Sequence, residues 1–180
     1  ILSGRYKKNE LNGLKRLQSD LPLVIAGAGV HGRFIYIICD NEFVIWNTLG
    51  TAGTWTTEKT DASRCKFTFL DNSNLYFTDS RNFGTLKVVT GRHQTIDKLQ
   101  SLGMDLLASD PGADLFLAHI RKKNSSNICK VLTDQKVIAG IGNCIKSEVL
   151  WHAEIYPFAT VSDLSDVDIT KLYKSIREIM

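Results

Sequence analysis

The apolar positions of residues 1–92 mostly follow the short period of β-strands. Residues 34–39 are continuously apolar and end at a turn signal, Asp40-Asn41, and a second apolar run at 43–46 follows at once, which predicts a hairpin. Further strands are predicted at residues 65–69, 75–78 and 85–89. Several short strands at this spacing are typical of an antiparallel β-sandwich or a barrel-like β domain.

From residue 93 onward the apolar positions follow the period of an α-helix. Residues 95–102 form a short amphipathic segment with Gly103 as its C-terminal stop. A helix at 111–123 carries its cations at the C-terminal end, where the helix dipole favours them. Three more helices are predicted: one capped by Ser125 or Ser126 and running to residue 135, one at 143–152, and one from Ser165, whose spacing to Asp168 resembles a capping box, to the chain's end.

The change of period predicts an α+β chain with two modules. An antiparallel β-sandwich module occupies residues 1–92, an α-helical module occupies 93–180, and residues 91–94 are the expected linker. No internal repeat or low-complexity segment is evident. A chain of 180 residues is long enough to bury a real core.

The bulk composition indicates an ordinary folded protein, because 43% of the residues are hydrophobic and 23% are charged. No apolar run approaches the ~18 residues that a membrane-spanning helix needs. Residues 1–8 lack the charged-then-apolar order of a secretory signal. We therefore expect an intracellular protein, in the cytoplasm or nucleoid or in the nucleus, that is neither secreted nor membrane-bound.

The net charge of +3 favours nucleic acid as a partner only where the cations cluster. They do so at Arg5, Lys7 and Lys8 and again at 121–123, although both runs are also compatible with ordinary solvated surface. The cysteines are irregularly spaced and form no C-x-x-C pair, so no metal site is predicted within the chain. Two of them lie in strand-like segments, where a reduced, buried thiol is expected. The four are Cys39, Cys65, Cys129 and Cys144.

The turn at residues 134–143, DQKVIAGIGN, carries the strongest chemical signal. Gly140 and Gly142 let the backbone turn sharply and approach another surface, and Asn143 opens the next helix. Free N–H groups at a helix start attract anions, so the segment is a candidate phosphate-binding site. A tight helix–helix connection without a ligand is the alternative. A nucleotide-binding loop is disfavoured because the third Gly of a dinucleotide fingerprint and the Lys-Ser/Thr of a P-loop are both absent.

Residues 134–157, DQKVIAGIGNCIKSEVLWHAEIYP, closely resemble the helix-two-turn-helix core of the formamidopyrimidine-DNA glycosylase/endonuclease VIII family. Upstream, LGTAG at 49–53 resembles that family's LGMSG-type loop, and TDSRNFG at 78–84 resembles its TD-x-R-x-FG loop. The similarity also includes LGMDLL at 102–107, LF at 115–116 and IRKK at 120–123, so it extends over nearly the whole chain in the right order.

The resemblance implies a set of DNA-binding residues. A glycosylase extrudes its target base and fills the space that the base vacates. The family's filler positions correspond here to Thr51, Arg81 and Phe83, within the loop that includes Asn82. Thr51 departs from the longer Met that is common there, which predicts a weaker wedge. Taken in isolation, Phe83 is better interpreted as a core aromatic at the end of a strand.

Other positions follow from the same resemblance. VHGRF at 30–34 places Arg33 at the family's lysine position, as the candidate catalytic residue. Arginine keeps the charge but donates no proton at neutral pH, which puts any elimination step that uses the lysine in doubt. Ala62 replaces a His that is common there. Gly142 and Asn143 match the family's DNA-binding motif, and Lys123 lies in its basic cluster.

The first functional hypothesis is a base-excision repair glycosylase with abasic-site lyase activity, which acts as a monomer on double-stranded DNA containing an oxidised base or an abasic site. The family's nucleophile is an N-terminal proline followed by glutamate, whereas Ile1-Leu2-Ser3-Gly4 looks like an interior strand. The chain as printed is therefore expected to be inactive. No cofactor is expected in this segment, and zinc would belong to a C-terminal finger beyond Met180.

Two alternatives remain open. The first is a non-catalytic module that binds damaged DNA and lacks the proline nucleophile. The second is an RNA-binding protein, since helix-two-turn-helix units occur in that class too. The loop at 81–83 argues against RNA, because a wedge has no role on an unflipped strand. The sequence leaves the choice between oxidised purines and oxidised pyrimidines undecided.

Overall fold

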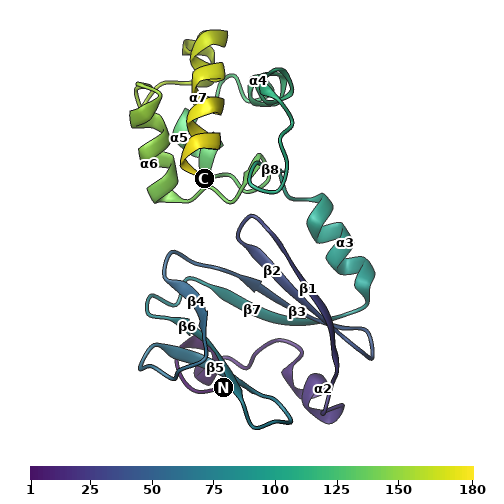
Figure 1. The fold of residues 1–180 in the computed structure, drawn as a ribbon. Coiled ribbons are helices and arrows are strands. Elements are labelled where there is room, and N and C mark those ends of the chain that lie inside the picture. Colours follow the sequence, from purple (N-terminus) through teal and green to yellow (C-terminus); the bar gives the residue numbers. More distant parts are fainter. The chain divides into compact units, whose positions relative to one another are not determined.

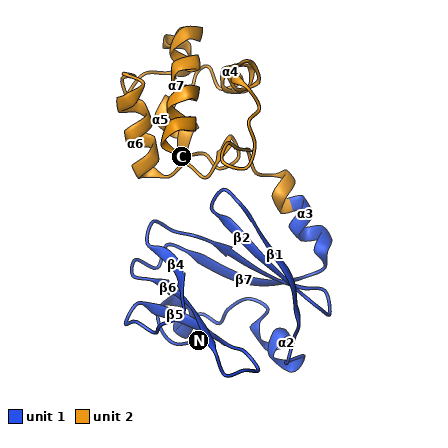
Figure 2. Ribbon diagram, viewed as in Figure 1, with its two compact units in different colours: residues 1–97 blue, residues 98–180 orange.

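The computed structural model describes residues 1–180 and divides into two compact units, residues 1–97 and residues 98–180 (Figure 2). The boundary lies inside helix α3 (Arg92–Gln100), five residues after the position that the sequence predicts. Residues 92–94, within the expected linker, form the first turn of that helix.

The first unit contains two antiparallel sheets, which confirms the predicted β-sandwich (Figure 1). The four-stranded sheet has the order β1-β2-β3-β7, and the three-stranded sheet has the order β4-β6-β5. Two short helices, α1 (Arg5–Lys8) and α2 (Leu14–Ser19), precede the strands. The strands are β1 (Ile25–His31), β2 (Phe34–Cys39), β3 (Phe43–Thr48), β4 (Gly53–Thr56), β5 (Ser63–Thr68), β6 (Asn74–Asp79) and β7 (Thr85–Thr90).

Apolar side chains from both sheets form the core of this unit. Because side chains alternate along a strand, Leu86 and Val88 of β7 face the same side and are both buried. They join Phe43 and Ile45 of β3 and Phe77 of β6 in one cluster. Burial of the clustered side chains provides the main driving force for packing the two sheets together.

The structure corrects the sequence-based expectations in three places. The pattern does not predict strands β1 and β4, because the segments IAGAGVH and GTWT are rich in residues with low strand propensity or are short. It does not predict helices α1 and α2 either. Ile1-Leu2-Ser3-Gly4 does not form a strand: the N–H groups of Leu2 and Ser3 both donate to the carbonyl oxygen of Arg64, and α1 follows directly.

The second unit is a helical bundle with one small parallel sheet. Strand β8 (Met104–Asp105) pairs with β9 (Ile138–Ala139). Helices α6 and α7 pack against each other, and α4 packs on α7 (Figure 1). Phe116, Leu132, Ile141 and Ile169 are fully buried in the single core of this unit. The helices are α4 (Ala113–Arg121), α5 (Ile128–Thr133), α6 (Asn143–His152) and α7 (Asp166–Ile179), with a 3₁₀ turn, η1 (Val161–Asp163).

Two of the five predicted helix starts are confirmed; α3 and α4 begin at Arg92 and Ala113 instead of at residues 95 and 111. Helix α6 begins at Asn143, and the capping box of Ser165 and Asp168 starts α7. Helix α5 is not capped by Ser125 or Ser126: the Asn127 side chain accepts from the N–H groups of Cys129 and Lys130. Helix α4 is also shorter than predicted. None of the helices combines the length and apolar character that a bilayer crossing requires.

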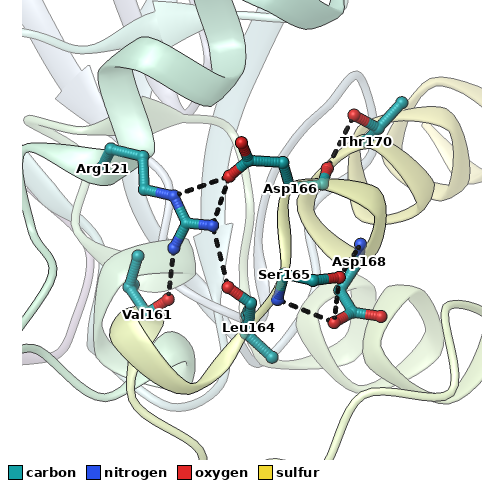
Figure 3. A network of polar contacts seen from close by, with 7 residues as sticks. All are labelled: Arg121, Val161, Leu164, Ser165, Asp166, Asp168 and Thr170. Carbon is teal, nitrogen blue, oxygen red and sulfur yellow. Dashed lines mark hydrogen bonds and ion pairs between the residues drawn. The ribbon is translucent and has the colours of Figure 1, made fainter.

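The Arg121 side chain holds the end of α4 to the start of α7 (Figure 3). Its guanidinium donates to the carbonyl oxygens of Val161 and Leu164 at 2.8 Å each and forms an ion pair with Asp166 at 2.5 Å. The Val161 oxygen also accepts from the N–H of Leu164 at 3.3 Å, so Arg121 adds a second bond to η1 and a bond to the residue that follows it. Only 27% of the Arg121 side chain is exposed. Arg121 therefore stabilises the helical unit and does not add to the surface charge of residues 122–123.

Candidate nucleic-acid interface

The loop between β6 and β7 is built around the buried carboxylate of Asp79. Asp79 is 0% exposed, and its two oxygens accept from the N–H of Arg81 at 3.1 Å and the N–H of Gly84 at 2.6 Å. The carboxylate therefore fixes both ends of the segment 81–83. Asn82 sits at the tip with φ 56°, a left-handed conformation that Asn tolerates better than most residues. The loop is held rigidly at its base while its tip remains accessible.

Phe83 projects from this loop with 59% of its surface exposed, so the interpretation of Phe83 as a core aromatic is wrong. The Arg81 guanidinium carbon lies 4.8 Å from the centre of the Phe83 ring, a cation–π contact. Exposing a large aromatic side chain is unfavourable in water, and a stacked guanidinium partly shields it. The pair presents a flat apolar ring next to a hydrogen-bond donor, which suits insertion beside a base.

Three further side chains brace the loop from behind. Arg64 donates to the carbonyl oxygens of Asp79 at 2.7 Å and Ser80 at 3.2 Å. The Arg5 guanidinium donates to the carbonyl oxygen of Asn82. The Tyr6 hydroxyl accepts from the N–H of Leu86 at 2.6 Å, and burial raises the Tyr6 pKa. The sequence does not predict this bracing, because bonds between residues far apart in the chain leave no local pattern.

The loop at residues 49–53, LGTAG, packs directly against the loop at residues 80–84, which is called the wedge loop below. A Cβ atom at Gly50 would lie 2.6 Å from the Gly84 nitrogen and 2.9 Å from the Phe83 Cβ, distances that real Cβ atoms do not tolerate. Glycine at position 50 is therefore required for the two loops to approach. Thr51 is exposed and follows Gly50 directly, so it is one residue along the chain from the contact with Phe83.

Arg33 lies in the tight turn between β1 and β2, where Gly32 has φ 55°. Its carbonyl oxygen accepts from the N–H of Leu49 at 2.9 Å, so this turn adjoins the loop that contains Thr51. The turn that contains Arg33 therefore contacts the loop that contains Thr51, and that loop contacts the loop that contains Phe83. Ala62 lies elsewhere: its carbonyl oxygen accepts from the N–H of Asp79 at 3.0 Å, beneath the wedge loop.

In the second unit, no side chain caps the backbone donors at the start of α6. Gly140 has φ 101°, which glycine tolerates and other residues do not. Gly142, the N-cap residue, is extended and makes no side-chain cap. Asn143 is exposed, and its Oδ1 accepts from the Lys146 ammonium at 3.4 Å. A helix start with uncapped N–H groups and a lysine one turn later attracts anions.

Lys123 is exposed beyond the end of α4. Its N–H donates to the carbonyl oxygen of Ile120 at 2.9 Å, and its carbonyl oxygen accepts from the N–H of Ser126 at 2.8 Å. The backbone at Lys123 is therefore fixed, while its side chain has no acidic partner within ion-pair distance. Lys122 and Lys123 are the solvent-facing charges of the run at 121–123.

The four cysteines are free thiols that do not gather into one site. Cys39 and Cys65 are buried, as the strand patterns predict. Burial raises the pKa of Cys65 to about 11 and also raises the pKa of Cys39, so both thiols stay protonated at neutral pH. Cys129 and Cys144 belong to different helices of the second unit.

Comparison with known proteins matches both units. Residues 102–180 match the family described as Formamidopyrimidine-DNA glycosylase H2TH domain. Over 162 residues the chain is 31% identical to the formamidopyrimidine-DNA glycosylase of Shouchella clausii, and the match covers 87% of this chain and 58% of that protein. The formamidopyrimidine-DNA glycosylase of Roseiflexus sp. is 31% identical over 169 residues, and the match covers 86% of this chain and 59% of that protein. The chain belongs to the formamidopyrimidine-DNA glycosylase family.

Solved structures of formamidopyrimidine-DNA glycosylases share the fold. MutM (Fpg) from Thermus thermophilus superposes with a TM-score of 0.73 at 27% identity, covering 87% of this chain and 58% of that chain. The Lactococcus lactis enzyme, bound non-covalently to DNA containing an AP site, gives a TM-score of 0.77 at 26% identity, covering 93% and 66%. The predicted family and fold class are therefore confirmed, and the chain spans somewhat more than half the length of these relatives.

Proposed function

We propose that this chain is the lesion-recognition and DNA-binding part of a base-excision repair glycosylase. In this proposal the protein binds double-stranded DNA as a monomer, extrudes an oxidised base and fills the gap with the Arg81–Phe83 loop. The observation that carries the proposal is the exposed Phe83 ring, stacked on Arg81 and held on a loop whose base is fixed by Asp79. A rigid exposed wedge has little use in a protein that leaves the duplex intact.

The proposed division of work follows the chemistry of each residue. Phe83 replaces the stacking lost by the extruded base, and the Arg81 guanidinium donates to the orphaned partner base. Thr51 lies beside them and occupies part of the gap, with less reach than a methionine. Arg33 binds a phosphate near the lesion, because its planar guanidinium matches phosphate oxygens with two parallel bonds.

The proposed activity includes strand cleavage at abasic sites. An arginine side chain does not act as a proton donor at neutral pH, so in this proposal Arg33 contributes charge and position to the strand-cleavage step. The amine that forms the imine with the opened sugar must come from another group, and an α-amine suits this task because its pKa is near ~8.

The direct test uses the protein expressed from its complete reading frame and duplexes carrying an oxidised purine, an oxidised pyrimidine or a preformed abasic site. We expect release of an oxidised base, strand cleavage and a covalent adduct after borohydride reduction. The second candidate, a non-catalytic module for damaged DNA, is favoured by the arginine at position 33. It predicts selective binding to abasic duplex with no base release and no adduct.

Asn143 is expected to contribute directly to DNA affinity in the same protein. Asn143→Ala removes the side-chain amide at the start of α6, where Gly142 leaves the backbone donors uncapped. Loss of one hydrogen bond to a charged phosphate should weaken binding by about 1–3 kcal/mol. Equilibrium binding to abasic-site duplex at physiological salt measures the change. An unchanged Kd would show that the Asn143 side chain does not bind the phosphate.

Lys123 and Arg121 should respond differently to the same change to alanine. Lys123 contacts no carboxylate, so Lys123→Ala should reduce the slope of log K against log salt by about 0.9 and leave the Tm unchanged. Arg121→Ala breaks the bonds to Val161 and Leu164 and should lower the Tm instead. Salt titrations and thermal unfolding of both variants separate the two roles. An equal salt slope for Lys123→Ala and the parent protein would contradict the assignment.

A further inference from the structure

The side chain of Gln135 ties the end of α5 to the turn that precedes α6. Its Oε1 accepts from the N–H of Gly140 at 2.9 Å. Its Nε2 donates to the carbonyl oxygen of Ile141 at 2.9 Å and to that of Thr133 at 3.1 Å. One half-buried amide thus makes three bonds, two of them to the residues immediately before Gly142.

These bonds determine the orientation of the donors at the start of α6. The Ile141–Gly142 peptide is planar and trans, so its N–H points opposite to its C=O. Because Nε2 of Gln135 holds the Ile141 oxygen, the N–H of Gly142 is directed away from Gln135. The Gly140 N–H is held from the same side, and the buried Ile141 side chain anchors the residue between them. Little freedom remains for the peptide to rotate.

We propose that Gln135 is the positioning residue of the phosphate site and orients the N–H of Gly142 and the start of α6 before DNA arrives. The inference rests on the proposed function of Gly142 and Asn143 as phosphate ligands. Gln135 itself does not touch the phosphate. Its contribution is to preorganise neutral donors, so that their orientation is already set when the anion binds.

Two variants separate the bonds that Gln135 makes. Gln135→Met keeps the length of the side chain and removes all three bonds. Gln135→Glu keeps the acceptor for Gly140 but cannot donate to Ile141 or Thr133 as a carboxylate. If the Ile141 bond sets the Gly142 N–H, both variants should weaken binding to a duplex with a tetrahydrofuran abasic-site analogue about tenfold. Gln100→Met, the same change at an exposed glutamine of α3, should leave the affinity unchanged.

A double-mutant cycle with Asn143→Ala supplies the readout that a general loss of stability would not give. If Gln135 acts through the start of α6, Gln135→Met should cost only about twofold in the Asn143→Ala background. The amide resonance of Gly142 should also shift in the DNA-free Gln135→Met protein. Binding is measured well below the Tm of every variant, and if the Met variant does not fold, the Glu variant enters the same cycle.

The possible results are distinguishable. Equal tenfold losses in both backgrounds together with an unchanged Gly142 amide resonance would overturn the inference, because Gln135 would then act elsewhere, and parent-like affinity of both Gln135 variants would overturn it as well. If Asn143→Ala alone leaves affinity unchanged, the proposed phosphate role of Asn143 fails. A loss with Asn143→Ala but none with Gln135→Met would leave the proposed function standing and reject only the positioning role.

Discussion

Phe83→Ala in the complete protein is expected to slow excision of a paired oxidised base by roughly 5- to 150-fold while cleavage at a preformed abasic site stays close to the parent rate. Stacking of an aromatic ring on a base is worth about 1–3 kcal/mol, and that energy offsets the cost of unstacking the target. At a preformed abasic site there is no base to extrude. Single-turnover rates on the two substrates measure the difference.

Binding of Phe83→Ala to undamaged duplex should scarcely change, because that binding depends on phosphate contacts. The Tm should also be nearly unchanged, since 59% of Phe83 is already exposed. Phe69→Ala is a matched control, because Phe69 is a partly exposed aromatic in a different turn of the same unit. Equal slowing on both substrates together with a lowered Tm would assign Phe83 to packing instead of the wedge.

The sequence predicts the regular elements where local signals are strong. The predicted segments 34–39 and 143–152 have the observed bounds, since a continuous apolar run before a turn and a glycine before a helix are local features. The capping box at Ser165 is predictable for the same reason. Strand β1 is not, because its four Gly and Ala residues obscure the apolar alternation, and neighbouring β2 supplies the pairing that makes it a strand.

The predicted site residues come from motif resemblance, and the structure adds the reasons that they lie where they do. Asp79 and Gly50 carry no signal of a DNA-binding residue, yet one fixes the wedge loop and the other lets a second loop approach it. The role of Gln135 is likewise not predictable from the sequence, because it depends on hydrogen bonds that form only in the folded turn. Arg121 shows the opposite error, since a basic run interpreted as surface charge includes a side chain that binds carbonyl groups of its own unit.

Gly103→Ala is expected to destabilise the second unit by about 3 kcal/mol, a fall in Tm of roughly 12–24 °C for a unit of this size. The sequence assigns Gly103 to a helix end, but α3 ends at Gln100 and the glycine has another role. A Cβ at position 103 would lie 2.2 Å from the carbonyl carbon of Val137 and 2.7 Å from the nitrogen of Ile138. These are backbone atoms, so no side-chain rotation relieves the overlap.

The damage should extend to the phosphate site, because the same contact aligns the turn before α6. The N–H of Gly103 donates to the carbonyl oxygen of Gln135 at 2.8 Å, and the N–H of Met104 donates to that of Val137 at 3.1 Å. Separating these strands would displace Gln135 and weaken binding to abasic duplex. Gly27→Ala is the control, since a Cβ at Gly27 meets nothing within 4 Å. Thermal unfolding measures both variants, and a Gly103→Ala protein that melts within about 2 °C of the Gly27→Ala protein, about 0.5 kcal/mol or less, would show that the two backbone segments separate without cost.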